Sequence, residues 1–142
     1  MEHLVKVKLL HQDAKIPEYK HPGDSGMDIR SVETIRINHC ESVGVHTGVA
    51  VELPEGFELQ ARPRSGLARK GIVAEFGTID NQYRGELIAT ITNHSMIPFT
   101  IEKGDRIAQL VLQPTYKATM VQVDELSNTA RGEGGFGSTG IK

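Results

Sequence analysis

The 142-residue sequence has no tryptophan and only one cysteine, Cys40. Aromatic residues make up 5% of the chain, so aliphatic side chains must fill its core. A single cysteine excludes an internal disulfide bond and favours a reducing compartment. No apolar stretch has the length of a membrane span or the composition of a signal peptide. We therefore expect a cytoplasmic protein without a membrane partner.

A strong charge of either sign is also missing. The 16 Lys and Arg residues nearly balance the 18 Asp and Glu residues, and the formal net charge is −2. Proteins that bind polymeric nucleic acid have a basic face, so we expect no such partner. The six histidines lie scattered, without the spacing of metal ligands. The length fits one domain with a sizeable core.

Short runs of alternating apolar and polar residues dominate the chain and predict β-strands. The predicted strands cover residues 5–9, 34–38, 49–53, 57–61, 87–93, 99–102, 106–113 and 120–123. Pro54-Glu55-Gly56 predicts a hairpin turn. One short helix is expected, with Ser65 as its N-cap and Gly71 as its end. The expected fold is all-β, a jelly-roll-like barrel or sandwich with one short helix.

The segment from Arg131 to Gly140 contains five glycines, and Phe136 is its only large apolar residue. It cannot bury enough surface to offset the entropy of ordering it. We therefore divide the chain into a β-barrel body, residues 1–130, and a flexible C-terminal arm, residues 131–142. The arm could close over a nucleotide with an aromatic face, a guanidinium and hydroxyl groups. The alternative is an ordinary disordered terminus.

Four cations lie close together at Arg62, Arg64, Arg69 and Lys70, around the start of the predicted helix. Free amides at a helix start, a hydroxyl and an arginine suit a phosphate group. A solvated basic loop is the alternative.

Two carboxylates lie in glycine-containing segments. Asp80, between Gly77 and Gly85, could act as a general base, or it could only form an Asx-turn. Asp28 could bind Mg²⁺ with help from water and substrate phosphates, or it could be a turn residue. Arg106 and Gln109 are the polar exceptions in an apolar strand, and an ion pair is the alternative explanation for Arg106.

Five segments, taken in order, resemble the trimeric deoxyuridine triphosphatase (dUTPase) family. They are residues 25–29, 63–68, 77–85, 104–110 and the glycine-rich arm. The resemblance implies a jelly-roll subunit and a homotrimer with shared active sites, in which another subunit donates the arm. It also implies Mg²⁺-dependent hydrolysis of dUTP to dUMP and pyrophosphate, which keeps uracil out of DNA and supplies dUMP for thymidylate synthesis.

The resemblance also implies the role of each residue. Asp80 activates the water that attacks the α-phosphate, and Asp28 orders water around a Mg²⁺ ion held mainly by the triphosphate. Tyr83 packs under the deoxyribose and disfavours a 2′-hydroxyl. Phosphate contacts come from Arg64, Ser65, Gly66 and Gln109. The uracil edge is read by the backbone of Gly77, Thr78 and Ile79. In the arm, Phe136 stacks on uracil, while Arg131, Gly137, Ser138 and Thr139 close on the terminal phosphates.

Two alternatives stay open. A dCTP deaminase shares the fold and the trimer, but that family carries a catalytic Glu where this sequence has Thr90. A dUTP-binding module without catalysis would not need both Asp80 and Asp28.

The sequence departs from the dUTPase pattern at Glu75-Phe76, where many members have small residues or Asn, and this difference falls at the uracil pocket.

Overall fold

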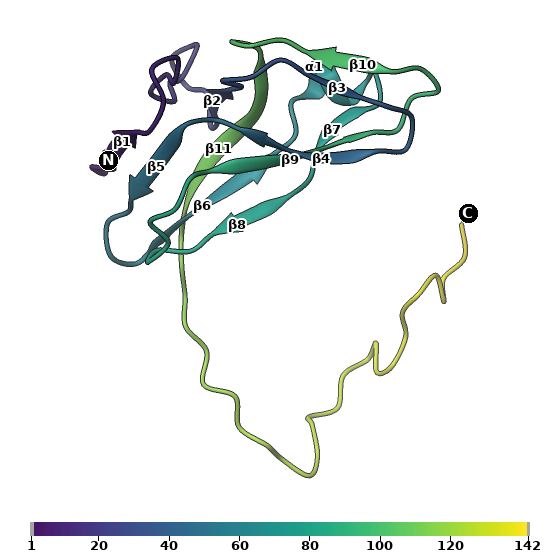
Figure 1. The fold of residues 1–142 in the computed structure, drawn as a ribbon. Helices are drawn as coiled ribbons and strands as arrows, with labels where there is room; N and C mark the ends of the chain where they lie inside the picture. Colours follow the sequence, from purple (N-terminus) through teal and green to yellow (C-terminus); the bar gives the residue numbers. More distant parts are fainter. Residues whose placement is uncertain (1, 142) are drawn as a thin grey trace.

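The computed structural model describes residues 2–141 and consists almost entirely of β-strands (Figure 1). The strands are β1 (Lys6–Leu9), β2 (Met27–Arg30), β3 (Ile35–Ile37), β4 (Ser42–His46), β5 (Val49–Glu52), β6 (Phe57–Arg62), β7 (Ile72–Ala74), β8 (Gly77–Ile79), β9 (Ile88–Asn93), β10 (Phe99–Ile101) and β11 (Arg106–Pro114). In the described residues the only helix is α1 (Ser65–Ala68). The all-β, jelly-roll-like prediction is confirmed. No helix in this range is long and apolar enough to cross a membrane.

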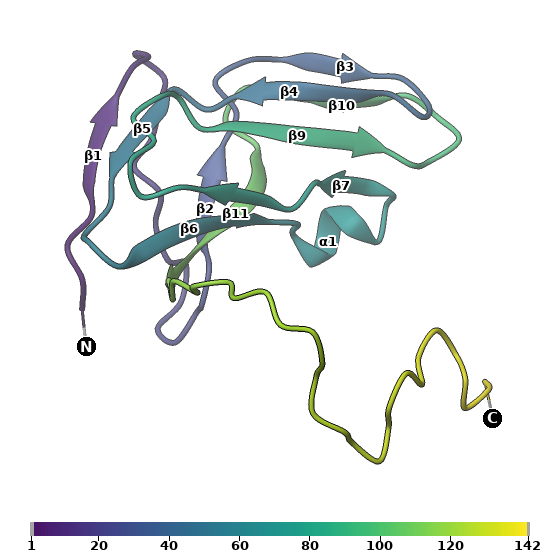
Figure 2. The ribbon, with the colours of Figure 1, turned by 90° about the horizontal axis from the view of Figure 1, so that it is seen from below.

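The strands form antiparallel sheets that pack as a sandwich. The largest sheet has the order β2-β11-β6-β8, and a second has the order β4-β9-β7. Figure 2 shows β3, β4, β9 and β10 on one side of the body and β2, β6 and β11 on the other. The core between them contains seven fully buried aliphatic side chains of large size: Ile29, Ile37, Leu59, Ile72, Ile91, Ile101 and Ile107. The buried hydrophobic residues that the structure describes include no aromatic side chain, as the composition predicted.

The largest sheet has two chemically different faces. Gln109 on β11 pairs with Asp28 on β2 and with Arg62 on β6, so these polar side chains share one face. Their neighbours Ala108 and Leu110 are buried on the other face. This alternation carries functional residues on one side of the sheet and part of the core on the other.

Three local predictions were wrong. Residues 54–56 do not join a hairpin, because β5 pairs with β1 while β6 pairs with β11 and β8. Residues 120–123 form no strand, and the Met120 and Val121 side chains are exposed because nothing in the described chain packs against them. Arg64, not Ser65, is the N-cap of α1, and no side chain caps this helix. Gly71 does end the helical segment, with a φ of 82°.

After Thr115, whose N–H donates to the carbonyl of Gly56, the chain leaves the body as an extended segment (Figure 1). It contains no strand up to residue 141, and Phe136 is fully exposed. The division between body and arm at residue 131 stays a prediction.

Candidate active site

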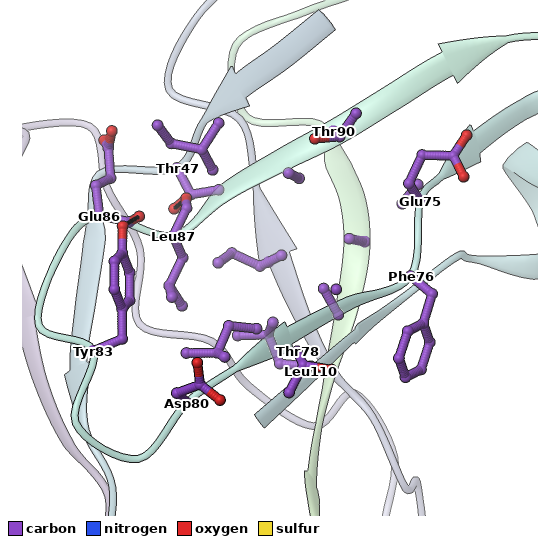
Figure 3. Close-up of a pocket in the computed structure, with 18 residues that line it drawn as sticks. Thr47, Glu75, Phe76, Thr78, Asp80, Tyr83, Glu86, Leu87, Thr90 and Leu110 are labelled. Carbon is purple, nitrogen blue, oxygen red and sulfur yellow. Dashed lines mark hydrogen bonds between the residues drawn. The ribbon is translucent and has the colours of Figure 1, made fainter. Parts of the chain in front are cut away.

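A pocket of about 280 Å³ opens between β8, the loop that follows it and the start of β9 (Figure 3). Its lining includes five residues predicted to contact substrate: Gly77, Thr78, Ile79, Asp80 and Tyr83. Ile29, Ala108 and Leu110 from the buried face of the largest sheet also line it. Small and aliphatic side chains on one side and polar groups at the opening suit a flat, partly polar ring.

β8 is the edge strand of its sheet, because it pairs with β6 and with no other described strand. An edge strand has a row of backbone N–H and C=O groups that the ladder does not use. Since Gly77, Thr78 and Ile79 line the pocket, these groups are available to a ligand with donors and acceptors along one edge.

Asp80 begins the loop after β8, and its carbonyl accepts the N–H of Tyr83 at 3.0 Å. This is a backbone turn and not the Asx-turn that the sequence offered as an alternative, because the acceptor is the Asp80 carbonyl and not its side chain. The residue is exposed and takes part in no ion pair within residues 2–141. Its carboxylate is therefore available to accept a proton from water.

The Tyr83 ring is fixed by its own loop. Its hydroxyl donates to the carbonyl of Glu86 at 2.9 Å, and the ring lies so close to Gly85 that a Cβ there would collide with it. A side chain at this glycine would therefore displace the ring from this position. Figure 3 shows Tyr83 and Glu86 together at one side of the pocket.

Asp28 lies in a different environment, on the polar face of the sheet. Arg64 Nε lies 3.1 Å from Asp28 Oδ1, and Arg106 Nη1 donates to Oδ2 at 3.1 Å. Arg64 also donates to the carbonyl of Arg106 at 3.1 Å, and Gln109 donates to the carbonyl of Pro63 at 2.9 Å. The simple explanation of Arg106 as an ion-pair partner is therefore correct.

The metal prediction can be tested against these contacts. The described residues contain no cluster of three or more His, Cys, Asp or Glu side chains that could hold an ion. Both oxygens of Asp28 are already engaged by arginines, but each carboxylate oxygen can accept a further hydrogen bond. The donor set therefore fits a Mg²⁺ ion coordinated chiefly by substrate phosphates and water, with Asp28 bonded to the water.

The family model for dUTPase matches residues 12–140. The chain belongs to the dUTPase family. It is 48% identical over 141 residues to the deoxyuridine 5′-triphosphate nucleotidohydrolase of Alkaliphilus metalliredigens, covering 97% of this chain and 98% of that protein. The corresponding protein of Hydrogenobaculum sp. is 51% identical over 140 residues, with 96% and 97% covered.

Solved dUTPase structures share the fold. The dUTPase of Staphylococcus bacteriophage 80alpha, solved with dUPNHPP, has a TM-score of 0.91 at 36% identity, covering 97% of this chain and 99% of that one. A mutant dUTPase from phage phi11 of S. aureus has a TM-score of 0.83 at 31% identity, with 88% and 99% covered. The latter structure is described as revealing the coordination of a structural Mg(II) ion.

The residues expected to act in a dUTPase fall into three places. The first is the pocket described above. The second is the polar face and the start of α1, with Asp28, Arg64, Ser65, Gly66 and Gln109. The third is the arm, with Arg131, Phe136, Gly137, Ser138 and Thr139, which extends away from the body in both views (Figures 1 and 2). Within one chain, the pocket residues, the polar-face residues and the arm residues therefore lie apart from one another.

Sequence reasoning missed Glu86, which lines the pocket beside Tyr83. It also missed the pairing of Asp28 with Arg64 and Arg106. Glu86 directly follows the third dUTPase segment, residues 77–85, and belongs to no motif. The Asp28 pairs join residues far apart in the chain, so no local spacing could reveal them.

Proposed function

We propose that this chain hydrolyses dUTP to dUMP and pyrophosphate by attack of water on the α-phosphate. The observation that carries the proposal is a pocket that combines the edge strand β8, an Asp80 with no ion-pair partner in residues 2–141, and a Tyr83 whose hydroxyl is bonded to its own loop. Curated relatives that cover nearly the whole chain carry the name of this activity. The reaction removes dUTP before its uracil enters DNA and supplies dUMP for thymidylate synthesis.

Base recognition uses the edge of β8. Uracil has alternating carbonyl and N–H groups along one edge, which match backbone donors and acceptors. As the family resemblance implies, we expect this pocket to exclude the methyl group of thymine. Tyr83 faces the sugar and disfavours a 2′-hydroxyl.

Asp80 serves as the general base. Its carboxylate has no ion-pair partner in residues 2–141 and can accept the proton of an attacking water. Asp28 is held by two arginines and orders the water around Mg²⁺, which the triphosphate holds. Support for the metal comes from the phage phi11 dUTPase, which is described with a structural Mg(II) ion.

The active site is shared between subunits of a homotrimer. Support comes from the largest sheet, where Asp28 and the phosphate-contacting Gln109 share one face while the pocket is lined by Ile29 and Ala108 from the other. One nucleotide cannot contact both faces of a sheet in the same chain. The pocket of one subunit therefore takes its phosphate contacts from a second subunit.

The arm completes the site in trans. Phe136 stacks on the uracil, and Arg131, Gly137, Ser138 and Thr139 contact the phosphates. An exposed aromatic residue in a glycine-rich segment gains contacts only when a base is present. Closure excludes water and holds the triphosphate in line for attack. The cytoplasmic location and the lack of a nucleic-acid or membrane partner stay predictions.

The deciding experiment measures pyrophosphate and ammonia release from dUTP, dCTP, dTTP and UTP with Mg²⁺. We expect pyrophosphate from dUTP, with little turnover of the other three. Ammonia from dCTP would support a deaminase, which Thr90 in the pocket argues against. Binding of dUTP without product would support the non-catalytic alternative.

A further inference from the structure

Glu86 joins the pocket loop to the turn between β4 and β5. Its Oε2 lies 2.5 Å from Nδ1 of His46, and its Oε1 accepts the N–H of Gly48 at 2.9 Å. Its carbonyl accepts the hydroxyl of Tyr83 at 2.9 Å. One residue therefore links His46, at the end of β4, to the tyrosine that faces the sugar.

The same turn and loop share two further bonds. The hydroxyl of Thr47 donates to the carbonyl of Leu87, and the N–H of Leu87 donates to the carbonyl of Val49 at 2.7 Å. These bonds hold the end of the loop at Leu87. The His46–Glu86 contact holds the preceding residue, whose carbonyl positions the Tyr83 ring.

The charged groups around His46 favour its protonated form. Glu86 faces it from the loop before β9, and Glu33 faces it from the segment after β2, where its carboxylate accepts the His46 N–H at 3.0 Å. On the paired strand β9, its neighbour Ile88 carries no charge. The hydrogen bond to Glu86, and then the charges of Glu86 and Glu33, raise the pKa of His46 above its ordinary 6.5.

We infer that His46 is a positioning residue, which holds Glu86 and Tyr83 in place and thereby sets how strongly the enzyme prefers deoxyribose over ribose. This inference rests on the proposed dUTP hydrolysis. Protonated His46 forms a charge-assisted bond to Glu86, which is stronger than the bond of the neutral ring. Because the pKa is raised in the folded protein, this contribution is complete below pH 6.5 and is lost as pH rises through the raised pKa.

The first test needs no activity. The imidazole protons of His46 are titrated by NMR in the intact protein and in Glu86→Gln, and thermal melts check that the variant is folded. We expect a His46 pKa above 6.5 in the wild type and a clear fall in Glu86→Gln. An equal His46 pKa in both proteins would overturn the inference and leave the proposed hydrolysis untouched.

The second test measures kcat/KM for dUTP and for UTP from pH 6 to 9. Both reactions share the triphosphate, the uracil and Asp80. The ratio of kcat/KM for dUTP to kcat/KM for UTP therefore removes the pH dependence that these groups contribute. We expect the wild-type ratio to fall about two- to fivefold through the His46 pKa, since a charged hydrogen bond exceeds a neutral one by a modest amount. His46→Gln should give a low, pH-independent ratio.

The matched control is His21→Gln, in a loop outside the pocket lining. It should keep the wild-type ratio and its pH profile. A wild-type profile in His46→Gln would overturn the inference. Failure to hydrolyse dUTP, together with a raised His46 pKa, would instead refute the proposed function and leave the His46–Glu86 pair intact.

Discussion

The polar face around Asp28 and the pocket loop around Asp80 use the same side chain in opposite ways. Asp28 lies on β2 of the largest sheet, with a side chain that is 16% exposed and an arginine on each oxygen. Asp80 lies in an exposed loop and has no ion-pair partner in residues 2–141. The Asp28 carboxylate is held between two arginines, while the Asp80 carboxylate, without an ion-pair partner in residues 2–141, is available for the proton transfer that we propose.

The largest expected effect is on turnover at Asp80. Asp80→Asn keeps the size of the side chain but removes the base, so we expect kcat to fall about 10²–10⁴-fold. The melting temperature should stay unchanged, because no ion pair is lost. Pyrophosphate release and a thermal melt measure the two effects. Near-normal turnover with saturating Mg²⁺ would contradict the role of Asp80.

Removal of the arm sharpens the comparison, because the hydrogen bonds of residues 131–141 all lie within residues 129–140 and none reaches the polar face or the pocket loop. Truncation after Ala130 should leave the fold and melting temperature intact and lower kcat/KM severely. Phe136→Ala should lose one base stack of about 1–3 kcal/mol, or about 5- to 150-fold in kcat/KM. Limited proteolysis with and without a non-hydrolysable dUTP analogue tests closure. Equal protection of the arm in both states would refute it.

Asp28→Asn should lower the melting temperature, which Asp80→Asn is expected to leave unchanged. It leaves Arg64 and Arg106 without their shared anion, at a cost of about 1.5–3 kcal/mol for charged hydrogen bonds. For a domain of this size we expect the melting temperature to fall by about 5–10 °C. Asp80→Asn is the matched control in the same melts. Equal melting temperatures for the two variants would mean that the Asp28 pairs do not stabilise the fold.

Much of the fold follows from alternation in the sequence. The strand from Phe57 was predicted because its apolar residues recur at every second position, and the strand from Arg106 because apolar residues fill most of the run. β8 was missed because Gly77-Thr78-Ile79 is too short to show a period, and residues 120–123 were misread because alternation does not supply a partner strand. The turn at Pro54 was read correctly as a turn, but turn residues do not tell which strands pair.

The chemistry of the site was easier to predict than its geometry. The segments around Asp80 and Arg64 carry residue types that suit proton transfer and phosphate binding. The pocket and the phosphate-binding residues lie on opposite faces of the largest sheet. This separation depends on the register of β2, β11 and β6, which no local pattern reveals. The contact between His46 and Glu86 likewise joins residues 40 positions apart.

The smallest effect is expected at the Lys6–Glu52 ion pair, which joins β1 to β5 at 3.0 Å. The hydrogen bond from Lys6, and then its charge, lower the pKa of Glu52 from 4.5. Its contribution is therefore present above pH 4.5 and is lost as pH falls through the lowered pKa. Both side chains are exposed, so solvent screens the pair. Glu52→Gln should have the same melting temperature as the wild type at pH 7 and at pH 3. A decrease in melting temperature as large as that of Asp28→Asn would show that burial does not distinguish the two kinds of ion pair.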